Sequence, residues 1–315
     1  MADSFSSPGI DLPSPSLSAR LRELADYLAA PSAGRLTEEQ RALALGIARR
    51  LIGEVAVRLD SQIDPAALWS DWLTGGIPGA ERLAGACYVR AEEHRWRELS
   101  ARRGAVPSLL PAKEEALDAT AEPESLSDTA RAYLDLRIAD RRRFDALGNP
   151  CLAIADLDPE LFRALLLDIA AWRLAQVSQD SGRATELGEA ARDALDGQPT
   201  ARGIDAAASA YYESLGDTLP DEASAVVARH DWPVLIGLAA AASHRAYDAM
   251  ALALLTAENA ALPSLLAPLR LDGTALMQIE ASLAALPARA VSGGMATDDY
   301  GGLIKARVDR GEDAR

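Results

Sequence analysis

The chain has 315 residues, of which 47 are acidic and 32 basic, so its net charge is −15 at pH 7. This acidic balance repels the phosphate backbone of nucleic acids, and we expect no nucleic-acid partner. With only 3 Phe, 7 Tyr and 5 Trp, the core must consist mainly of Leu and Ala, which are strong helix formers. Residues that favour strands are too scattered to predict a sheet. The composition therefore predicts an all-α fold.

An N-terminal helical bundle is predicted over residues 16–103, after a disordered leader over residues 1–15. A first helix covers about residues 16–29. Thr37 and Gln40 form a capping-box pattern at the start of a long helix whose apolar residues recur every four positions: Leu43, Ile47, Leu51, Val55 and Leu59. Asp64 and Pro65 predict the start of a short helix that ends at Gly75 and Gly76. A further helix over residues 78–103 has a charged second half, which we expect to be exposed.

A linker is predicted over residues 104–126, where prolines and acidic residues are frequent, and a central helix pair over residues 127–180. Its first helix runs from Ser127 to Leu147, and its second starts at Asp158 and Pro159. Three charged residues interrupt the apolar sequence of the second helix and point in different directions: Arg163, Asp168 and Arg173. We therefore expect the second helix to be buried on all sides.

The C-terminal part is predicted to be a HEAT-like helical array over residues 181–287, followed by a flexible tail over residues 288–315. Its expected helices cover about residues 183–195, 204–214, 221–229, 232–242, 245–257, 259–268 and 274–286. Helices of this length with short connections are typical of stacked helix pairs, although the letters show no strict repeat.

One stretch of the central region carries a resemblance to a known family. The segment from Ile138 to Pro150, the segment from Asp156 to Leu161 and the Ala170-Ala171-Trp172 triplet resemble a family of uncharacterised all-helical proteins from alphaproteobacteria. That family is known only as a domain of unknown function. The resemblance covers about residues 37–286 and implies a HEAT-like C-terminal half and a bacterial cytoplasmic setting. It implies no catalytic residues.

A charged cluster near the end of the first central helix is the main candidate site. Asp140 falls on a predicted buried stripe, so its carboxylate needs a partner such as Arg137 or an arginine of a neighbouring helix. The side chains of the Arg141-Arg142-Arg143 run fan over about 200° on a helix and cannot all meet one ligand. We expect a structural ion-pair network, with an anion or phosphopeptide site as the alternative, among Arg137, Asp140, Arg142, Arg143 and Asp145.

Two histidine-based functions remain as alternatives. His230 and Asp231 invite comparison with metal-dependent phosphohydrolases that use a His-Asp pair, but Asp231 also fits a helix N-cap before Trp232 and Pro233. His94, in the charged helix, suggests a module for histidine phosphotransfer or kinase dimerisation. Phosphate-binding loops, dinucleotide-binding motifs and nucleophile elbows are missing from the sequence. We therefore expect no catalytic residue, no cofactor and no metal.

The remaining features favour a cytoplasmic, non-enzymatic interaction or regulatory protein that binds another protein through helical surfaces. Cys87 and Cys151 fit free thiols in a reducing compartment. The leader lacks the pattern of a signal peptide, and no apolar stretch reaches the length of about 20 residues that a membrane span needs. We also expect a homodimer through the helix over residues 38–59, because Leu45 and Ile52 lie off its main apolar row.

Overall fold

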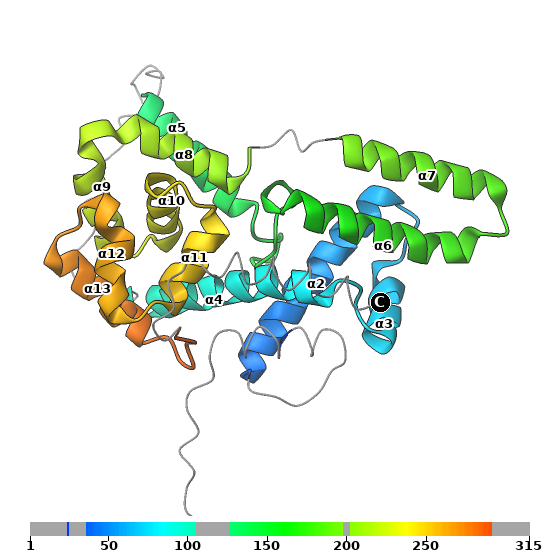
Figure 1. Ribbon diagram of the computed structural model, residues 1–315, viewed down its shortest axis with the longest axis horizontal. Helices are drawn as coiled ribbons and strands as arrows, with labels where there is room; N and C mark the ends of the chain where they lie inside the picture. The colour runs from blue at the N-terminus through cyan, green and yellow to red at the C-terminus, as the bar shows by residue number, and fades with distance from the viewer. Residues whose placement is uncertain (1–23, 25–35, 105–126, 198–201, 292–315) are drawn as a thin grey trace, which may run out of the picture.

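The computed structural model describes residue 24 and residues 36–104, 127–197 and 202–291 (Figure 1). The predicted leader, the first helix apart from Leu24, and most of the predicted linker and tail lie outside these residues. The described chain is all-helical, as predicted, and its only β interaction is a single bridge between Phe144 and Pro150. The α-helices are α2 (Glu38–Leu59), α3 (Pro65–Gly75), α4 (Ala80–Gly104), α5 (Asp128–Arg141), α6 (Pro159–Val177), α7 (Ser181–Asp196), α8 (Ile204–Leu215), α9 (Leu219–Ala228), α10 (Trp232–Ala242), α11 (Tyr247–Thr256), α12 (Leu262–Leu266) and α13 (Gly273–Ala284).

Helix starts that were predicted from capping residues are confirmed. The backbone N–H of Gln40 donates to the Thr37 hydroxyl over 3.2 Å, and the Gln40 side chain accepts from the backbone N–H of Thr37 over 3.0 Å. Asp64 and Asp158 each accept hydrogen bonds from the first turn of the helix that follows, which is α3 or α6. These bonds satisfy backbone donors that have no partner inside a helix, and they fix where each helix begins.

Two clusters of buried hydrophobic side chains make up the core. The α10 cluster contains residues of α5 and of α8–α13, among them Leu136, Tyr211, Trp232, Met250 and Ile279. The α2 cluster contains residues of α2, α3, α6 and α7, among them Ile47, Leu51, Trp69, Leu166 and Leu187. Helix α4 runs across both and contributes Trp96 to the first and Cys87 to the second (Figure 1). The two clusters are therefore joined by one helix.

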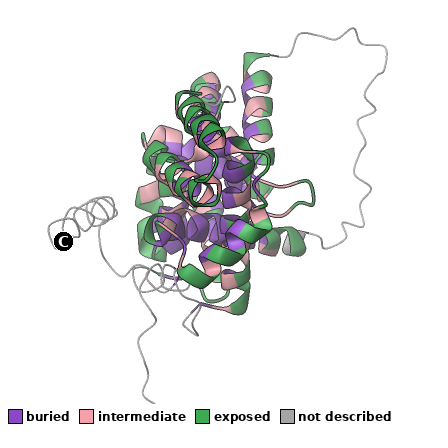
Figure 2. Cartoon of the chain, turned by 90° about the vertical axis from the view of Figure 1, so that its right-hand side faces the viewer, coloured by how far each residue is buried: buried purple, intermediate pink, exposed green. Residues whose placement is uncertain are grey.

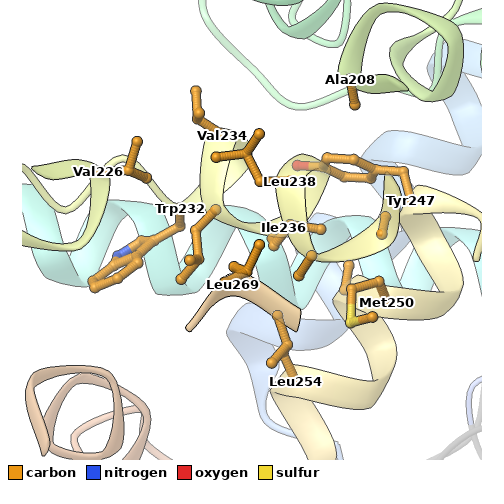
Figure 3. Packing of buried hydrophobic residues seen from close by; sticks show 14 of the residues in the cluster. Ala208, Val226, Trp232, Val234, Ile236, Leu238, Tyr247, Met250, Leu254 and Leu269 are labelled. Atoms are coloured by element: carbon orange, nitrogen blue, oxygen red, sulfur yellow. The ribbon is translucent and has the colours of Figure 1, made fainter. Parts of the chain in front are cut away.

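Helix α10 lies at the centre of its cluster, and every residue from 232 to 240 is buried. Figure 3 shows its side chains among those of Tyr247, Met250, Leu254 and Leu269. The rings of Trp232 and Trp96 stack with their centroids 4.5 Å apart. In a stacked array each repeat contacts only its neighbours, whereas here α9 also packs against α13. The HEAT-like arrangement stays a prediction.

The end of the first central helix differs from the prediction. Helix α5 ends at Arg141, six residues before the expected Leu147. The Asp145 carboxylate accepts from the backbone N–H groups of Leu147 and Asn149, and Gly148 adopts a φ of 83°, which favours glycine. These bonds hold residues 145–149 in a turn that cannot continue a helix.

The expectation that the second central helix is buried on all sides is wrong. Helix α6 buries only Leu165, Leu166 and Ile169, whereas Leu167 and Leu174 are 44% and 45% exposed. The two central helices also do not form a buried pair, because α5 packs in the α10 cluster and α6 in the α2 cluster. The sequence shows how apolar a helix is. Which of its sides become buried depends on the helices that pack against it in the fold (Figure 2).

The expectation that the charged half of α4 is exposed is also wrong. Of residues 90–96, all but His94 are buried, including the charged side chains of Arg90, Glu92 and Glu93. Helix α2 is covered within the chain by α3, α4, α6 and α7, and Ile52 is fully buried. The apolar surface on which the predicted homodimer through α2 rested is thus largely occupied.

None of the helices in the described ranges has the length and apolar character that crossing a bilayer requires.

Two positions on α6 test this assignment of its faces. Ile169→Asp places an unpaired charge in the α2 cluster, so we expect it to lower the free energy of unfolding by at least about 3 kcal/mol or to prevent folding. Leu167→Asp, two residues away on the exposed side, should change it by no more than about 0.5 kcal/mol. Urea unfolding followed by circular dichroism measures both. Equal destabilisation would mean that both faces of α6 are covered.

Helices α10 and α8 approach each other closely at Gly237. A Cβ atom at this position would lie 3.0 Å from the Cβ of Ala208 on α8. Gly237→Val should therefore lower the free energy of unfolding by about 1–3 kcal/mol through overpacking. At Gly85 of α4 a Cβ would meet no atom within 4 Å, so Gly85→Val is the matched control and should cost less than about 0.5 kcal/mol. Similar costs in urea unfolding would contradict a tight crossing at Gly237.

Candidate functional site

A buried network of charged side chains lies where the two hydrophobic clusters meet. Helix α4 presents Arg90, Glu93 and Arg97 along one face, because residues three and seven positions apart lie above one another on a helix. The segment after α5 places Arg143 against this face, and the start of α11 adds Tyr247. Arg90, Glu93, Arg143 and Tyr247 are all nearly inaccessible to solvent.

The Glu93 carboxylate is the shared partner in this network. Its Oε1 atom accepts from the Tyr247 hydroxyl over 2.9 Å and from Arg143 Nη1 over 3.1 Å. Its Oε2 atom lies 2.9 Å from Arg143 Nη2 and 3.2 Å from Arg90 Nη1. One carboxylate thus compensates two buried guanidinium groups from different parts of the chain, as buried charges require.

The arginines of α4 also hold the segment that follows α5. Arg90 donates to the backbone carbonyl oxygens of Arg143, over 2.7 Å, and Cys151, over 3.1 Å. The guanidinium groups of Arg90 and Arg97 lie 4.6 and 4.8 Å from the ring centroid of Phe144, within the range of cation–π interactions. The backbone polar groups and the aromatic ring of this segment are therefore both bound by α4.

Further contacts of Arg97 and Arg143 extend the network to Asp140 of α5, to Asp156 and to Asp248 of α11. Arg97 binds the Asp140 carboxylate through two hydrogen bonds of 2.6 and 3.1 Å. Arg143 lies 3.3 Å from the half-buried carboxylate of Asp248 and 3.9 Å from that of Asp156, and its guanidinium group stacks over the Tyr247 ring at 4.6 Å. Bidentate and stacked contacts of this kind require the planar guanidinium of arginine.

The structure separates the five residues of the predicted cluster. Asp140 and Arg143 enter the network, but Arg142 is exposed. Arg137 Nη1 lies 2.8 and 3.0 Å from the two carboxylate oxygens of Asp231, the residue before α10, and Asp145 binds Arg50 of α2 over 3.0 Å. The partner of Asp140 is thus an arginine of a neighbouring helix. Arg142 and Arg143 do not converge on one site, because Arg142 is exposed and the Arg143 side chain is buried.

Sequence reasoning missed the residues that α4 and α11 contribute to the network. The spacing of Arg90, Glu93 and Arg97 on one helix face was a detectable signal. Asp248 was a second signal, because it interrupts the apolar sequence of α11. Neither signal identifies a partner, since Glu93 and Tyr247 are 154 residues apart in the chain.

The network is charged at neutral pH. Burial by itself raises the pKa of Glu93, but the adjacent guanidinium groups of Arg143 and Arg90 outweigh burial and hold this pKa at about 2. Burial and the carboxylate of Glu93 raise the pKa of Tyr247 well above its usual value, so its hydroxyl keeps the proton that it donates. Burial also raises the pKa of Asp156, which accepts from the backbone N–H of Ile204 over 2.7 Å. These groups are bound to one another and stabilise the fold.

The histidines considered for phosphotransfer or metal binding lie apart. His94 is partly buried with its ring centroid 6.0 Å from that of Phe144, and burial together with Arg90 lowers its pKa. His230 lies edge-on against Trp232, while the neighbouring Asp231 carboxylate is bound by Arg137. Among the residues that the structure describes, no group of three or more His, Cys, Asp or Glu side chains is arranged to hold a metal ion.

Comparison with family models, with curated proteins and with solved structures finds no match to this chain. The resemblance to the alphaproteobacterial family stays a prediction, and the site must be interpreted from its own geometry. Its most buried charges are enclosed and paired across three segments. This arrangement suits a structural junction, because side chains that are already bound to one another are not free to meet a ligand.

The depressed pKa of Glu93 predicts a specific loss of stability in acid. Because this pKa is lower in the folded chain than in the unfolded chain, ionised Glu93 stabilises the fold fully above about pH 4.5. The contribution, on the order of 3 kcal/mol, should be lost as the pH falls from about 4.5 to about 2. Urea unfolding at a series of pH values measures it.

The matched variant for this titration is Glu93→Gln, which keeps the shape of the side chain and removes its titration. Its stability should be lower at neutral pH by about 3–5 kcal/mol and should fall less steeply in acid than that of the unaltered chain. If the variant does not fold, the titration of the unaltered chain still decides. A stability that stays constant from about pH 4.5 to about pH 2 would contradict the assigned role of Glu93.

Proposed function

We propose that this chain is a cytoplasmic, non-enzymatic interaction protein that binds another protein through exposed faces of its helices. The observation that carries the proposal is that two well-packed helices leave large aliphatic side chains exposed in rows. On α5 these are Leu134 and Ile138, which are 43% and 50% exposed. On α6 they are Leu167 and Leu174. Residues four or seven positions apart share one face of a helix, so each pair forms a row that a partner can cover.

The buried network supports binding over catalysis as the role of this chain. Its carboxylates and guanidinium groups hold α4, α5 and α11 together, so they give the exposed side of α5 a fixed position. Rigid presentation of apolar side chains favours protein binding, because little conformational freedom is lost when a partner docks. Cys87 and Cys151 are both free and buried, which favours a reducing compartment.

The predicted HEAT-like array and the predicted self-association are finer parts of this proposal. A helical array would present its helices side by side to a partner, as adaptor proteins do. A second copy of the chain is one partner that the exposed rows on α5 or α6 could accept, in a two-fold arrangement. Self-association through α2 is not included, because the other helices of the α2 cluster cover most of its apolar residues and leave only Val57 exposed among its large ones.

Crosslinking in the native cells, followed by affinity capture and mass spectrometry, tests the proposal. The variants are Leu134→Ser with Ile138→Ser on α5 and Leu167→Ser with Leu174→Ser on α6. We expect at least one pair to reduce the yield of a crosslinked protein by about tenfold, because a buried leucine contributes on the order of 1.4 kcal/mol or more. Met277→Ser, at an exposed position on α13, is the control and should leave the yield unchanged.

The same capture can contradict the proposal. If both pairs of variants fold, as judged by circular dichroism, and recover the same crosslinked proteins as the unaltered chain, neither row is a binding surface. Light scattering of the purified chain separates the two kinds of partner. A dimer mass that the α5 or α6 variants reduce to a monomer mass identifies a second copy as the partner.

A further inference from the structure

One exposed face of α5 combines aliphatic and basic side chains, and we call it the α5 face. At 100° per residue its four helical members lie within about 80° of one another around the helix axis and span about 15 Å along it, and the fifth follows the last residue of the helix. The two aliphatic side chains lie in the middle, with basic side chains toward both ends. The α5 face consists of Arg131, Leu134, Ile138, Arg141 and Arg142.

The fold holds the α5 face outward. The opposite side of the helix is buried through Leu136 and Ala139 in the α10 cluster, and Asp140 is bound there by Arg97. Helix α5 packs most extensively against α8 and lies at the edge of its cluster (Figure 1). The face therefore cannot rotate inward without breaking the charge network and the packing of α5.

Two basic groups, Arg141 and Arg142, lie at the end of the α5 face. Arg141 and Arg142 are exposed and form no ion pair with any residue that the structure describes. Two other arginines have carboxylate partners on α5, because Arg131 lies 3.0 Å from Asp128 and Arg202 lies 3.5 Å from Asp135. A cation at a helix C-terminus is also favoured by the helix dipole, but the dipole does not account for exposed Leu134 and Ile138. In a chain with a net charge of −15, this is a local basic and apolar surface.

We propose that the α5 face binds an acidic amphipathic helix of a partner protein. The partner would pack aliphatic side chains one turn apart against Leu134 and Ile138 and place carboxylates beside Arg141 and Arg142. Arginine pairs well with carboxylates in such positions, because its planar guanidinium can donate two parallel hydrogen bonds. This inference rests on the proposed protein-binding function and adds the binding surface and the chemistry of the partner.

The charge distribution favours a peptide over a larger anionic surface. A helix covers only the α5 face, and charges beyond about 8 Å are screened at physiological salt, so the acidic remainder of the chain has little effect on it. A membrane or a nucleic acid would bring many other acidic side chains within that distance. Exposed aromatic side chains, which would stack on unpaired bases, are also absent from the α5 face.

The α6 row lacks this combination of features. The charged residues on the same side of α6 include one of each sign, Glu160 and Arg163, so the charge does not select an acidic partner. A row that is apolar but not basic should depend little on the salt concentration. The two rows therefore predict different binding behaviour.

A designed peptide tests the proposal with the full chain. The probe is a fluorescent helical peptide of about 14 residues that has two leucines four positions apart, glutamates on both sides of them and alanine elsewhere. Fluorescence anisotropy should show saturable binding that weakens as salt rises from about 0.05 to about 0.5 M. Replacing the glutamates of the probe with lysine, or its leucines with serine, should weaken binding by about tenfold or more.

Variants of the chain locate the site. Arg141→Glu with Arg142→Glu should weaken binding of the acidic probe by about tenfold or more, and so should Leu134→Ser. Arg49→Glu with Arg192→Glu, at exposed positions on α2 and α7, changes the net charge equally and should alter the affinity by less than about twofold. Met277→Ser is the apolar control. Circular dichroism shows that each variant is folded before binding is measured.

Several outcomes overturn the proposal. Binding that the α2 and α7 charge variants weaken as much as the α5 variants would indicate general electrostatics. Absence of saturable binding, or binding of phosphatidylglycerol vesicles that requires Arg141 and Arg142 while the peptide does not bind, would also overturn it. If crosslinked partners in the native cells are lost with the α6 variants and retained with the α5 variants, protein binding stands and the assignment to α5 fails.

Discussion

The buried carboxylate of Glu93 is the group on which the arrangement of the helices depends. Two guanidinium groups and one phenolic hydroxyl meet at it, and they come from α4, from the segment after α5 and from α11. Removing such charges from water costs several kcal/mol for each ion, and only close partners offset this cost. All three segments must therefore be in place together, because an arrangement that omits one leaves a buried charge or a buried hydrogen-bonding group without its partner.

This requirement links the two hydrophobic clusters and positions the α5 face. Helix α4 contributes Trp96 to the α10 cluster and Cys87 to the α2 cluster, and its charged face lies between them. Through Arg97 and Asp140 the same face fixes α5, so the α5 face points outward on a rigid support. Two features together support a binding role. Buried charges hold the helices in place, and rows of aliphatic side chains stay exposed.

Local features of the fold were predictable from the sequence, and burial was not. Thr37, Asp64 and Asp158 marked helix starts because capping depends on a few adjacent residues. The burial of α4 and α6 was predicted wrongly, because the charged and apolar content of a helix does not show which other helices pack against it. The charges of α4 are buried with partners from distant parts of the chain, whereas Leu167 on apolar α6 faces outward. Within the candidate site Asp140 was recognised as needing an arginine, but Arg97 could not be chosen without the fold.

Native-state hydrogen exchange tests most directly whether the charge network makes the two clusters one cooperative unit. Amides of α2 and of α10 report on one cluster each, and their exchange can be followed by mass spectrometry as urea is raised below the unfolding transition. We expect the most protected amides of both helices to open together, with the same free energy and the same urea dependence. In the Glu93→Gln variant the two helices should open separately. If α2 and α10 open with clearly different free energies in the unaltered chain, the network does not couple the clusters and this account is contradicted.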